Sequence, residues 1–298
     1  MDSFASPMRK IAPFHGLTFF FLLGLSLLTL CLRAQIPLWR SLLIRYGVLL
    51  ALLIAITAFS GRKTMGKGGA LLHYFSPILF VFLIYESLGD LIQHLHPDID
   101  PWLIRIDFSL FGVHPTVWME RWIVPWLTDI MSIAYVCYYF LPVTFIAFLY
   151  LQQRTAALDV SLFVLIFGYY ISFVGYIFLP AIGPRFTLAH LQSTPLEGSF
   201  FTNLLRDTLN ALEHNKRDCM PSGHTQIVLM VLYLAHRYTR LLFYLFFPII
   251  CGLLLSTVYL RYHYVVDVFA GGAVAVGCIL IGPRLHRWWS RACGRPSA

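Results

Sequence analysis

Apolar residues run along this chain in long blocks separated by short polar stretches. Eight blocks show no strand-like alternation, and each reaches the roughly 17–25 residues that a helix needs to cross a bilayer. They contain very few Asp, Glu, Lys or Arg residues. The pattern predicts spanning helices over 14–32, 41–60, 70–93, 130–150, 160–184, 220–236, 241–260 and 264–283. We therefore expect an all-α integral membrane protein of about eight transmembrane helices.

Two polar or mixed segments between these helices are more than simple connections. Residues 97–127 combine apolar and charged positions with four tryptophans, Trp102, Trp118, Trp122 and Trp126. Such a segment is expected to lie along the membrane surface, with its indole rings at the level of the lipid headgroups. Residues 185–219 form the longest polar loop and lead into the most distinctive motif of the chain.

Composition supports a membrane protein and excludes several other classes. Of the 298 residues, 58% are hydrophobic and 12% are charged, against about 25% charged in soluble domains. This scarcity of charge excludes a soluble domain and a disordered chain. The net charge of +8 comes largely from basic residues at the ends of apolar blocks, so it gives no reason to expect nucleic acid as a partner. The six cysteines form no CxxC pair, and no disulfide framework or zinc site is expected.

Basic residues in the short loops predict the orientation of the chain. With a cytoplasmic N-terminus, 12 of the 22 Lys and Arg residues fall on the inner side, as the positive-inside rule requires. Arg33, Arg40 and Arg45 contradict this rule, so the first hairpin is placed less firmly. The long loop 185–219 then lies outside. We expect a multi-pass protein of the plasma membrane, or of a bacterial inner membrane, with its active site on the outer or periplasmic face.

The segment 218–225, Asp-Cys-Met-Pro-Ser-Gly-His-Thr, opens the sixth predicted helix. Pro221, Ser222 and Gly223 are typical of a helix N-terminus, where free backbone N–H groups and the helix dipole favour an anion. Ser222 is also a good helix cap. His224 lies in the first turn, where it is placed to give a proton to an anion bound there.

A second polar motif, 256–267, precedes the last predicted helix. If that helix begins near its end, His263 and Asp267 are four residues apart and share a face. A carboxylate in that position holds one imidazole nitrogen as N–H and leaves the other free to attack. Arg261 places a fixed positive charge beside this pair.

Topology brings these two motifs to the same membrane face, because 220–236 and 241–260 form an antiparallel pair. The fifth predicted helix ends on that face too, with Gly183-Pro184-Arg185. Arg185 is therefore expected to join the cluster as a guanidinium fork for a phosphate group.

The combination of Pro-Ser-Gly-His at 221–224, Tyr-Leu-Arg-Tyr-His-Tyr-Val-Val-Asp-Val at 259–268 and Ala-Gly-Gly at 270–272 resembles the type 2 phosphatidic acid phosphatase superfamily. The resemblance covers roughly residues 70–283. It implies that His263 is a nucleophile that forms a phosphohistidine, that Asp267 orients it, and that His224 protonates the leaving oxygen. It further implies that phosphate is bound by Arg185, Ser222 and the Gly223 amide, and that neither metal nor cofactor is needed.

Departures from the lipid phosphatase pattern point to one branch of this superfamily. No lysine occurs at 176–183, the first motif reads Pro184-Arg185 rather than Arg-Pro, and the third begins Ser256-Thr257 with its arginine at 261. These features look more like inositol-phosphorylceramide synthases and their bacterial relatives, which pass a phospho-headgroup from one lipid to another alcohol. The resemblance thus implies a lipid phosphotransferase with a phospholipid donor and a lipid or polyol acceptor.

Two alternatives stay open from the sequence. One is a hydrolase of lipid phosphates or polyprenyl pyrophosphates, which differs only in using water as the acceptor. The other is a non-catalytic lipid transporter, although such a protein would be expected to have lost a key histidine or the aspartate. The sequence suggests three regions, namely an N-terminal transmembrane hairpin at 1–69, a catalytic membrane core at 70–283 and a basic cytoplasmic tail at 284–298. The oligomeric state is not predicted.

Overall fold

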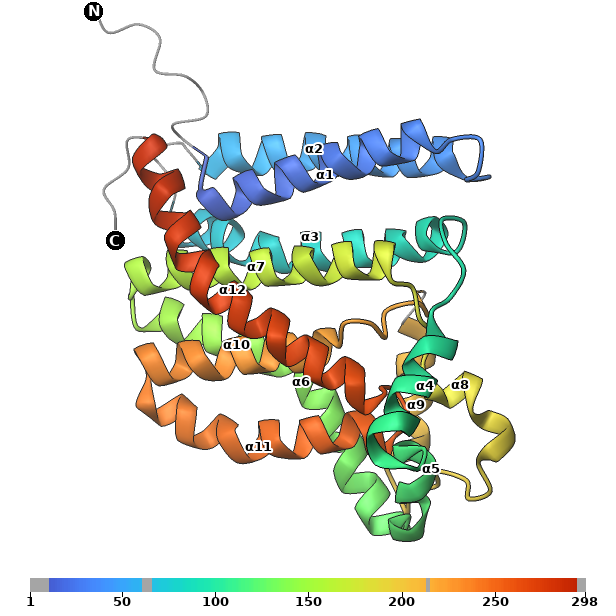
Figure 1. Cartoon of the computed structure of the whole chain (residues 1–298). Coiled ribbons are helices and arrows are strands. Elements are labelled where there is room, and N and C mark those ends of the chain that lie inside the picture. The colour runs from blue at the N-terminus through green and yellow to red at the C-terminus, as the bar shows by residue number, and fades with distance from the viewer. Residues whose placement is uncertain (1–10, 61–65, 213–214, 294–298) are drawn as a thin grey trace, which may run out of the picture.

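The computed structural model describes residues 11–60, 66–212 and 215–293, and this part of the chain folds into helices without a strand. Figure 1 shows the long helices running side by side as a bundle. The elements are α1 (Pro13–Cys31), α2 (Trp39–Ser60), α3 (Lys67–Ile92), α4 (Asp100–Phe111), α5 (Pro115–Trp118), η2 (Met119–Trp122), α6 (Pro125–Leu151), α7 (Thr155–Phe178), α8 (Pro184–Thr187), η3 (Ala189–Leu191), α9 (Thr202–Leu212), α10 (Gly223–Tyr238), α11 (Arg240–Tyr259) and α12 (Val265–Ala292).

A long helix forms at every one of the eight predicted ranges. Within the described residues, seven of these helices are long and apolar enough to cross a membrane, namely α1, α2, α3, α6, α7, α11 and α12. The eighth, α10, has only 16 residues, or about 24 Å of helix. The all-α membrane fold is confirmed. α10 begins three residues later and ends two residues later than the predicted range 220–236.

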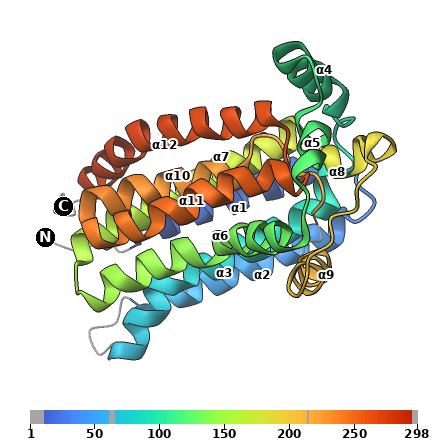
Figure 2. The same cartoon turned by 90° about the horizontal axis from the view of Figure 1, so that it is seen from below.

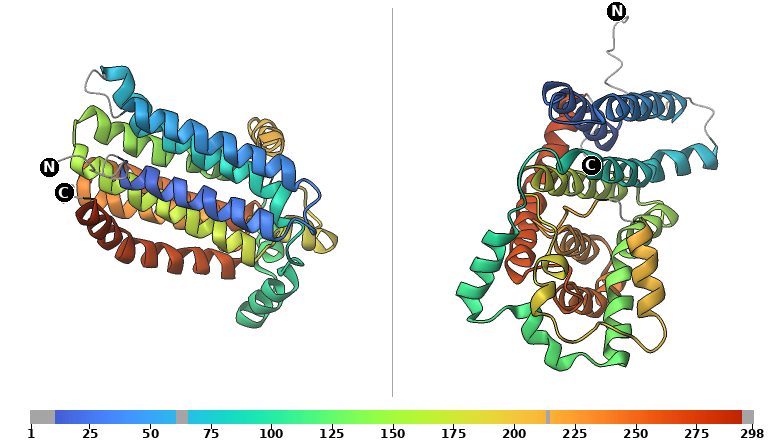
Figure 3. Two further views of the ribbon diagram at one scale, coloured as in Figure 1. Left: turned by 90° about the horizontal axis from the view of Figure 1, so that it is seen from above. Right: turned by 90° about the vertical axis from the view of Figure 1, so that its right-hand side faces the viewer.

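The short helix α10 lies in the middle of the bundle. It packs against α6, α7, α11 and α12, and most of its residues are buried. The first two helices form a pair at one side, where α1 contacts α7 and α2 contacts α3, as Figures 2 and 3 show. A helix surrounded by protein need not match the thickness of the lipid, which accounts for the length of α10.

The two ends of the bundle differ in character. The short helices α4, α5, α8 and α9 all gather at one end, while α1 begins and α12 finishes at the other (Figure 1). Of the basic residues used to predict orientation, Arg9, Lys10, Arg62, Lys63 and Arg295 lie outside the described residues. The turn between α6 and α7, with Arg154, and the turn between α10 and α11 lie at the end opposite the short helices.

The tryptophan-rich segment becomes a set of short helices at the crowded end. Trp102 of α4 is 65% exposed, and Trp126 at the start of α6 is 62% exposed. Trp118 and Trp122 pack edge to face and are also exposed. Exposed indoles at the end of a membrane bundle are suited to the headgroup layer.

An ion pair explains one exception to the positive-inside rule. Arg45, in α2, donates a hydrogen bond of 2.7 Å to Asp90, in α3. The guanidinium is thereby neutralised within the bundle, so Arg45 does not act as a topological signal. Asp90 is engaged in this pair rather than in the polar cluster at the crowded end.

The glycines of α12 permit one close contact that matters for the site. A Cβ atom at Gly271 would collide with the carbonyl oxygen of Ser222, whereas a Cβ at Gly277, on the same helix, would meet nothing within 4 Å. Gly271 therefore lets α12 approach the first turn of α10.

A Gly271→Ala substitution is expected to destabilise the protein by about 1–3 kcal/mol, because overpacking against backbone forces the two helices apart. Activity should fall as well, since the same contact sets the position of His224. Gly277→Ala is the matched control and is expected to be neutral or stabilising by up to about 1 kcal/mol. Thermal unfolding in detergent measures both variants, and equal behaviour of the two would contradict the assignment.

Candidate active site

Two histidines and an aspartate form a chain of contacts at the crowded end of the bundle. Nδ1 of His224 lies 3.2 Å from Nε2 of His263, and Nδ1 of His263 lies 3.1 Å from Oδ1 of Asp267. His224 belongs to the first turn of α10 and Asp267 to the first turn of α12. All three side chains are buried. The two motifs thus meet, as the topology predicted.

The contact between His263 and Asp267 does not arise within one helix. His263 lies in the connection before α12, which begins at Val265. Asp267 accepts a hydrogen bond of 3.0 Å from the backbone N–H of Tyr264, in the capping arrangement that starts the helix. The carboxylate therefore holds the helix start and the imidazole together, which replaces the shared helix face that the spacing suggested.

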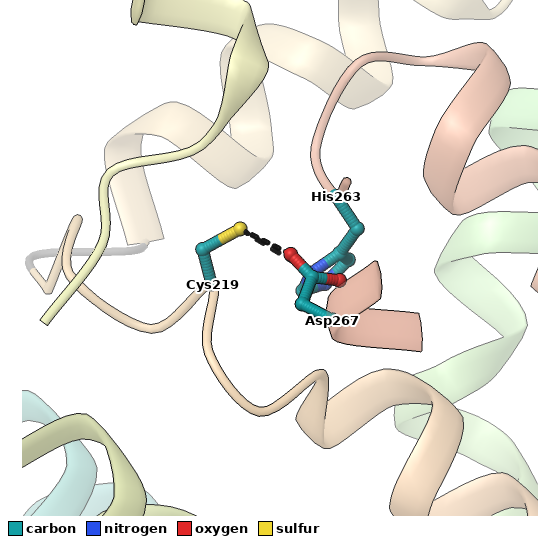
Figure 4. Close-up of side chains that lie close together, drawn as sticks. All are labelled: Cys219, His263 and Asp267. Carbon is teal, nitrogen blue, oxygen red and sulfur yellow. Dashed lines mark hydrogen bonds and ion pairs between the residues drawn. The ribbon is translucent and has the colours of Figure 1, made fainter. Parts of the chain in front are cut away.

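Cys219 completes the surroundings of this carboxylate (Figure 4). Its thiol donates a hydrogen bond of 2.7 Å to Oδ2 of Asp267, and Sγ lies 3.7 Å from Nδ1 of His263. The Cys219 thiol, the Tyr264 amide and the His263 imidazole thus all contact the two carboxylate oxygens of Asp267. An imidazole held in this way presents Nδ1 to the carboxylate and leaves Nε2 for chemistry.

Ser222 and Gly223, at the start of α10, are enclosed by other parts of the protein. Ser222 is fully buried and caps α10, with its hydroxyl accepting a 3.3 Å hydrogen bond from the Thr225 amide. Its own amide donates to the backbone carbonyl of Asp267 at 3.2 Å. Gly223 gives room to the hydroxyl of Tyr176, which a Cβ there would meet. These residues join α10 to α12, and their contact with phosphate stays a prediction.

Two aromatic rings pack against His224. Tyr135 stacks on the imidazole with ring centroids 4.6 Å apart, and Tyr138 lies 4.2 Å from it. Tyr135 also stacks on Tyr262 at 4.4 Å. This packing fixes the plane of the His224 ring and keeps its exposure low.

A cavity of about 50 Å³ opens onto the two histidines. Cations, an acid, aromatic rings and the reactive side chains share its wall, which includes Arg185, Lys216, Asp218, Cys219, His224, His263, Tyr135, Tyr262 and Phe186. Nε2 of His224 has no hydrogen-bond partner among the described residues. Two cations beside an unsatisfied imidazole nitrogen make this cavity suitable for an anion.

Arg185 reaches the cavity from a tight turn after α7. The helix ends at Phe178, earlier than predicted, and Arg185 lies in the short helix α8. Gly183 has φ +88°, and a Cβ there would lie 2.7 Å from the carbonyl oxygen of Tyr262, so this position requires glycine. The guanidinium lies over the ring of Tyr262 at 5.5 Å. This ring fixes the plane of the guanidinium at the wall of the cavity.

Arg261 lies in a different place from the other predicted phosphate ligands. Its guanidinium donates to Glu120 at 2.7 Å, to the carbonyl of Thr194 at 2.7 Å and to Gln192 at 3.2 Å. It lines a neighbouring cavity and not the one that contains the histidines. Its backbone has φ +65°, a left-handed conformation that turns the chain between α11 and His263.

Three further charged residues near this end of the bundle, Lys216, Arg217 and Glu86, have separate positions. Lys216 lines the histidine cavity, where it places an ammonium group that the first motif does not supply. Arg217 instead forms an ion pair with Asp98, with Nε 2.6 Å from the carboxylate. Glu86 does not line that cavity. Of this group, only Lys216 is placed to meet an anion beside the histidines.

Charges around the site favour the protonated form of His263. Burial lowers the pKa of its imidazole, and the carboxylates of Asp267 and Asp218 raise it by more, so that the pKa lies above its usual value. Burial raises the pKa of Asp218, against a hydrogen bond from Tyr85 that lowers it. The Tyr85 hydroxyl donates this bond at 2.6 Å.

Cys219, His263 and Asp267 also have side-chain types that bind metals, and their ligand atoms lie within 4.8 Å of one another. In this structure the thiol and the imidazole both face the carboxylate. The contacts are those of a hydrogen-bonded group that orients His263. We therefore infer that Cys219 and Asp267 position the imidazole of His263.

Asp100 supports the site, although the sequence analysis gave it no role. It is 2% exposed and accepts hydrogen bonds from the amides of Ile182 and Gly183, at 2.9 and 2.8 Å, and from the Tyr264 hydroxyl at 2.8 Å. It thus ties the turn that carries Arg185 to the residue after His263. Its partners are 82 to 164 positions away, so no local signal revealed it.

An Asp100→Asn substitution is expected to destabilise the protein by about 2–3 kcal/mol, because it replaces one acceptor oxygen by an NH2 donor that faces buried donors. Activity should fall with it, since the turn that positions Arg185 loosens. Asp98→Asn is the matched control, whose partly exposed pair with Arg217 contributes less than about 1 kcal/mol. Thermal unfolding and turnover in detergent measure both, and a larger effect at Asp98 would refute the role given to Asp100.

Comparison with known proteins places the chain in a family. The family model of the PAP2 superfamily matches residues 101–281, a range that contains both histidines, Asp267 and Arg185. A PA-phosphatase related-family protein of Dictyostelium discoideum is 31% identical over 119 residues, which are 38% of this chain. The match spans about a fifth of that relative, 21% of its length. No solved structure matches the chain. With the family model covering more than half of its residues, the chain belongs to the type 2 phosphatidic acid phosphatase (PAP2) superfamily.

Proposed function

We propose that this protein is a membrane lipid phosphotransferase that moves a phospho-headgroup from a phospholipid donor to an alcohol through a phosphohistidine. The observation that carries the proposal is the contact chain from Asp267 through His263 to His224. It lies beside Arg185 and Lys216 in one cavity. Such a site combines a nucleophile, a proton donor and cations for a phosphate group.

In the first step, Nε2 of His263 attacks phosphorus and forms the N–P bond. The P–O bond to the departing alcohol breaks, and that oxygen takes a proton from His224. Because the two imidazole nitrogens now face each other at 3.2 Å, the phosphate replaces this contact by binding between them. Arg185 and Lys216 offset the charge that develops on the phosphoryl oxygens.

In the second step, an acceptor alcohol gives its proton to His224 and attacks phosphorus, and the N–P bond breaks. His263 is released in its starting form. The proposed substrate-binding residues are Arg185, Ser222, the Gly223 amide and Arg261, of which Ser222 and Gly223 would act through the start of α10. The proposal uses no cofactor, and it takes residues 70–283 as the catalytic core with 1–69 as an accessory hairpin.

The preference for a transferase rests on the first motif. No lysine occurs at 176–183 and the order is Gly-Pro-Arg, which resembles the inositol-phosphorylceramide synthase branch. A lipid phosphate phosphatase is the second candidate, and the printed name of the Dictyostelium relative favours it. The two reactions differ only in whether an alcohol or water attacks the phosphohistidine.

The test uses purified protein and a phospholipid carrying a labelled headgroup, with and without an added alcohol acceptor. A transferase forms a labelled product only when the acceptor is present. Release of the phospho-headgroup to water at the same rate in both reactions would establish the phosphatase instead. His263→Ala without any loss on lipid phosphates would exclude the phosphohistidine in either case.

We also propose that the active site faces the outer or periplasmic side of the plasma membrane or bacterial inner membrane. Arg154 lies in the turn between α6 and α7, and Arg237 and Arg240 lie at the adjoining ends of α10 and α11. These positions are at the opposite end of the bundle, which the positive-inside rule assigns to the cytoplasm. A membrane-impermeant label on cysteines introduced at Trp126 and at Arg154 tests this. In intact cells the first should be labelled and the second protected, and the reverse pattern would overturn the orientation.

A further inference from the structure

Helix α4 lies at the crowded end of the bundle and runs across the direction of the long helices (Figure 1). Its exposed side carries Trp102, Ile106 and Leu110, which are spaced one turn apart and therefore form one stripe. Phe108 and Phe111 are exposed as well. A short helix with such a stripe, at the end of a membrane bundle, is suited to the boundary between lipid headgroups and acyl chains.

Cations lie beside the aromatic rings of this surface. The guanidinium of Arg105, on α4, lies over the ring of Trp102 at 5.3 Å, and that of Arg121, on η2, lies over Trp118 at 4.4 Å. Both arginines are exposed. An indole with a guanidinium stacked on it presents an apolar ring and a positive charge at the same depth, which fits a phosphate group above a hydrocarbon layer. The partner that fits this surface is therefore a layer of phospholipid.

The opposite side of α4 is buried and carries two carboxylates. Its buried residues are Asp100, Leu103 and Asp107, whose spacing places them on one face. Asp107 is 1% exposed and accepts hydrogen bonds from the amides of Val265 and Val266, at 2.9 and 2.8 Å. These amides belong to the first turn of α12, where a helix has no acceptors of its own for them. Asp107 thus holds the start of α12.

The two carboxylates of α4 hold different parts of the active site. Asp100 binds the turn that carries Arg185, through the amides before it. Asp107 binds the start of the helix that carries Asp267. Because both belong to one helix of 12 residues, a displacement of α4 moves the Arg185 turn and the start of α12 together. The surface that suits lipid and the carboxylates that hold the site are therefore two sides of the same element.

We propose that the exposed side of α4 binds the phospholipid headgroup layer, and that this contact keeps the Arg185 turn and the start of α12 in their catalytic positions. Asp100 and Asp107 are then positioning residues, and Trp102 is the anchor on the lipid side. The inference goes beyond the proposed function, because it holds equally for an alcohol and for water as the acceptor.

Two tryptophans offer a matched pair for the test. Trp102 on α4 and Trp288, near the opposite end of α12, are 65% and 64% exposed. The full chain is placed in vesicles of phosphatidylcholine and phosphatidylglycerol, and the turnover of a lipid phosphate that the wild type accepts is measured. Trp102→Gln is expected to lower kcat about fivefold. Trp102→Tyr, which keeps an amphipathic ring, and Trp288→Gln should both stay close to the wild type. No loss in Trp102→Gln, or an equal loss in Trp288→Gln, would overturn the proposal.

Inhibition by orthovanadate, an oxyanion that mimics phosphate, tests the geometry of the site without a lipid. The concentration that gives half inhibition should rise about threefold in Trp102→Gln and not in Trp288→Gln, because the Arg185 turn is displaced only in the first. Lower turnover with unchanged inhibition would show that α4 affects only the access of lipid, and the link to the site would be wrong. A wild type that vanadate does not inhibit would count against the proposed function instead.

Asp107→Asn tests the path from the lipid to α12. If Trp102 acts through this carboxylate, adding Trp102→Gln to Asp107→Asn should lower kcat by no more than about twofold, since coupled residues are not additive. A further loss of about fivefold would show that the two residues act independently, which contradicts the coupling.

The depth of Trp102 is measured apart from activity, so it stays informative if a variant folds poorly. The fluorescence that is present in the wild type and absent in Trp102→Tyr should be quenched more by a phospholipid with a nitroxide on its headgroup than by one with a nitroxide at the end of an acyl chain. Quenching in the reverse order, or by neither lipid, would remove α4 from the headgroup layer.

Discussion

Replacing His263 with asparagine is expected to lower kcat on every lipid substrate of this protein by roughly 10⁴-fold. The amide nitrogen of asparagine has no lone pair available to form the N–P bond, so the two-step reaction through a covalent intermediate is lost. What remains is the binding of phosphate by Arg185 and Lys216. The loss should appear in kcat, with a much smaller change in KM.

His96→Asn is the matched control, because His96 is exposed and lies outside the cavity of the histidines. It should keep full activity. Incubation with a lipid carrying a radioactive phosphate tests the intermediate directly: the wild type should retain covalent label and His263→Asn should not. Label that persists in His263→Asn would place the nucleophile elsewhere, even if turnover were reduced.

The helices of this protein could be predicted from the sequence because the membrane leaves few alternatives. Backbone N–H and C=O groups have no water to bind in the hydrocarbon layer, so an apolar block of sufficient length has to be helical. The convergence of His224, His263 and Asp267 followed from the same reasoning, since antiparallel helices return the two motifs to one end. Strong local patterns and simple topology were sufficient for both.

The tertiary contacts of polar residues could not be predicted in this way. Arg261 has the charge and the place in the sequence that suit a phosphate ligand. Its guanidinium nevertheless donates a hydrogen bond to Glu120, 141 positions away. Asp107 accepts the amides of Val265 and Val266 at the start of α12, a role that nothing near residue 107 indicates. The partners of such residues come from distant helices, and a single sequence contains no record of that pairing.

The surroundings of α10 show a different limit of prediction from sequence. The apolar block at 220–236 was read as a spanning helix because lipid and protein surroundings both favour apolar side chains. The residue pattern does not distinguish a helix that faces lipid from one enclosed by four others. The structure resolves this through packing, because α10 contacts α6, α7, α11 and α12.

Replacing Asp267 with asparagine should have the second large effect, a loss of roughly 10³-fold in kcat at the optimum pH together with a displaced pH profile. His263 attacks only when Nε2 is unprotonated, so activity falls as the pH drops through the pKa of this imidazole. The neighbouring carboxylates, Asp267 before Asp218, hold this pKa above its usual value against the effect of burial. Without the charge of Asp267 the pKa falls, and the acidic limb of kcat/KM moves to lower pH.

Cys219→Ser is the control for this shift, since serine still donates a hydrogen bond to Asp267 and leaves its charge in place. Its acidic limb should coincide with that of the wild type. A purely structural role for Asp267 would lower the rate of Asp267→Asn at every pH without moving the limb. A limb that stays fixed would therefore show that another group controls the acidic side, and Asp218, which lines the same cavity, would be the next residue to replace. A limb that moves down in Asp267→Asn and not in Cys219→Ser identifies the charge of Asp267 as the cause, because both variants change the contacts of this side chain and only one of them removes its charge.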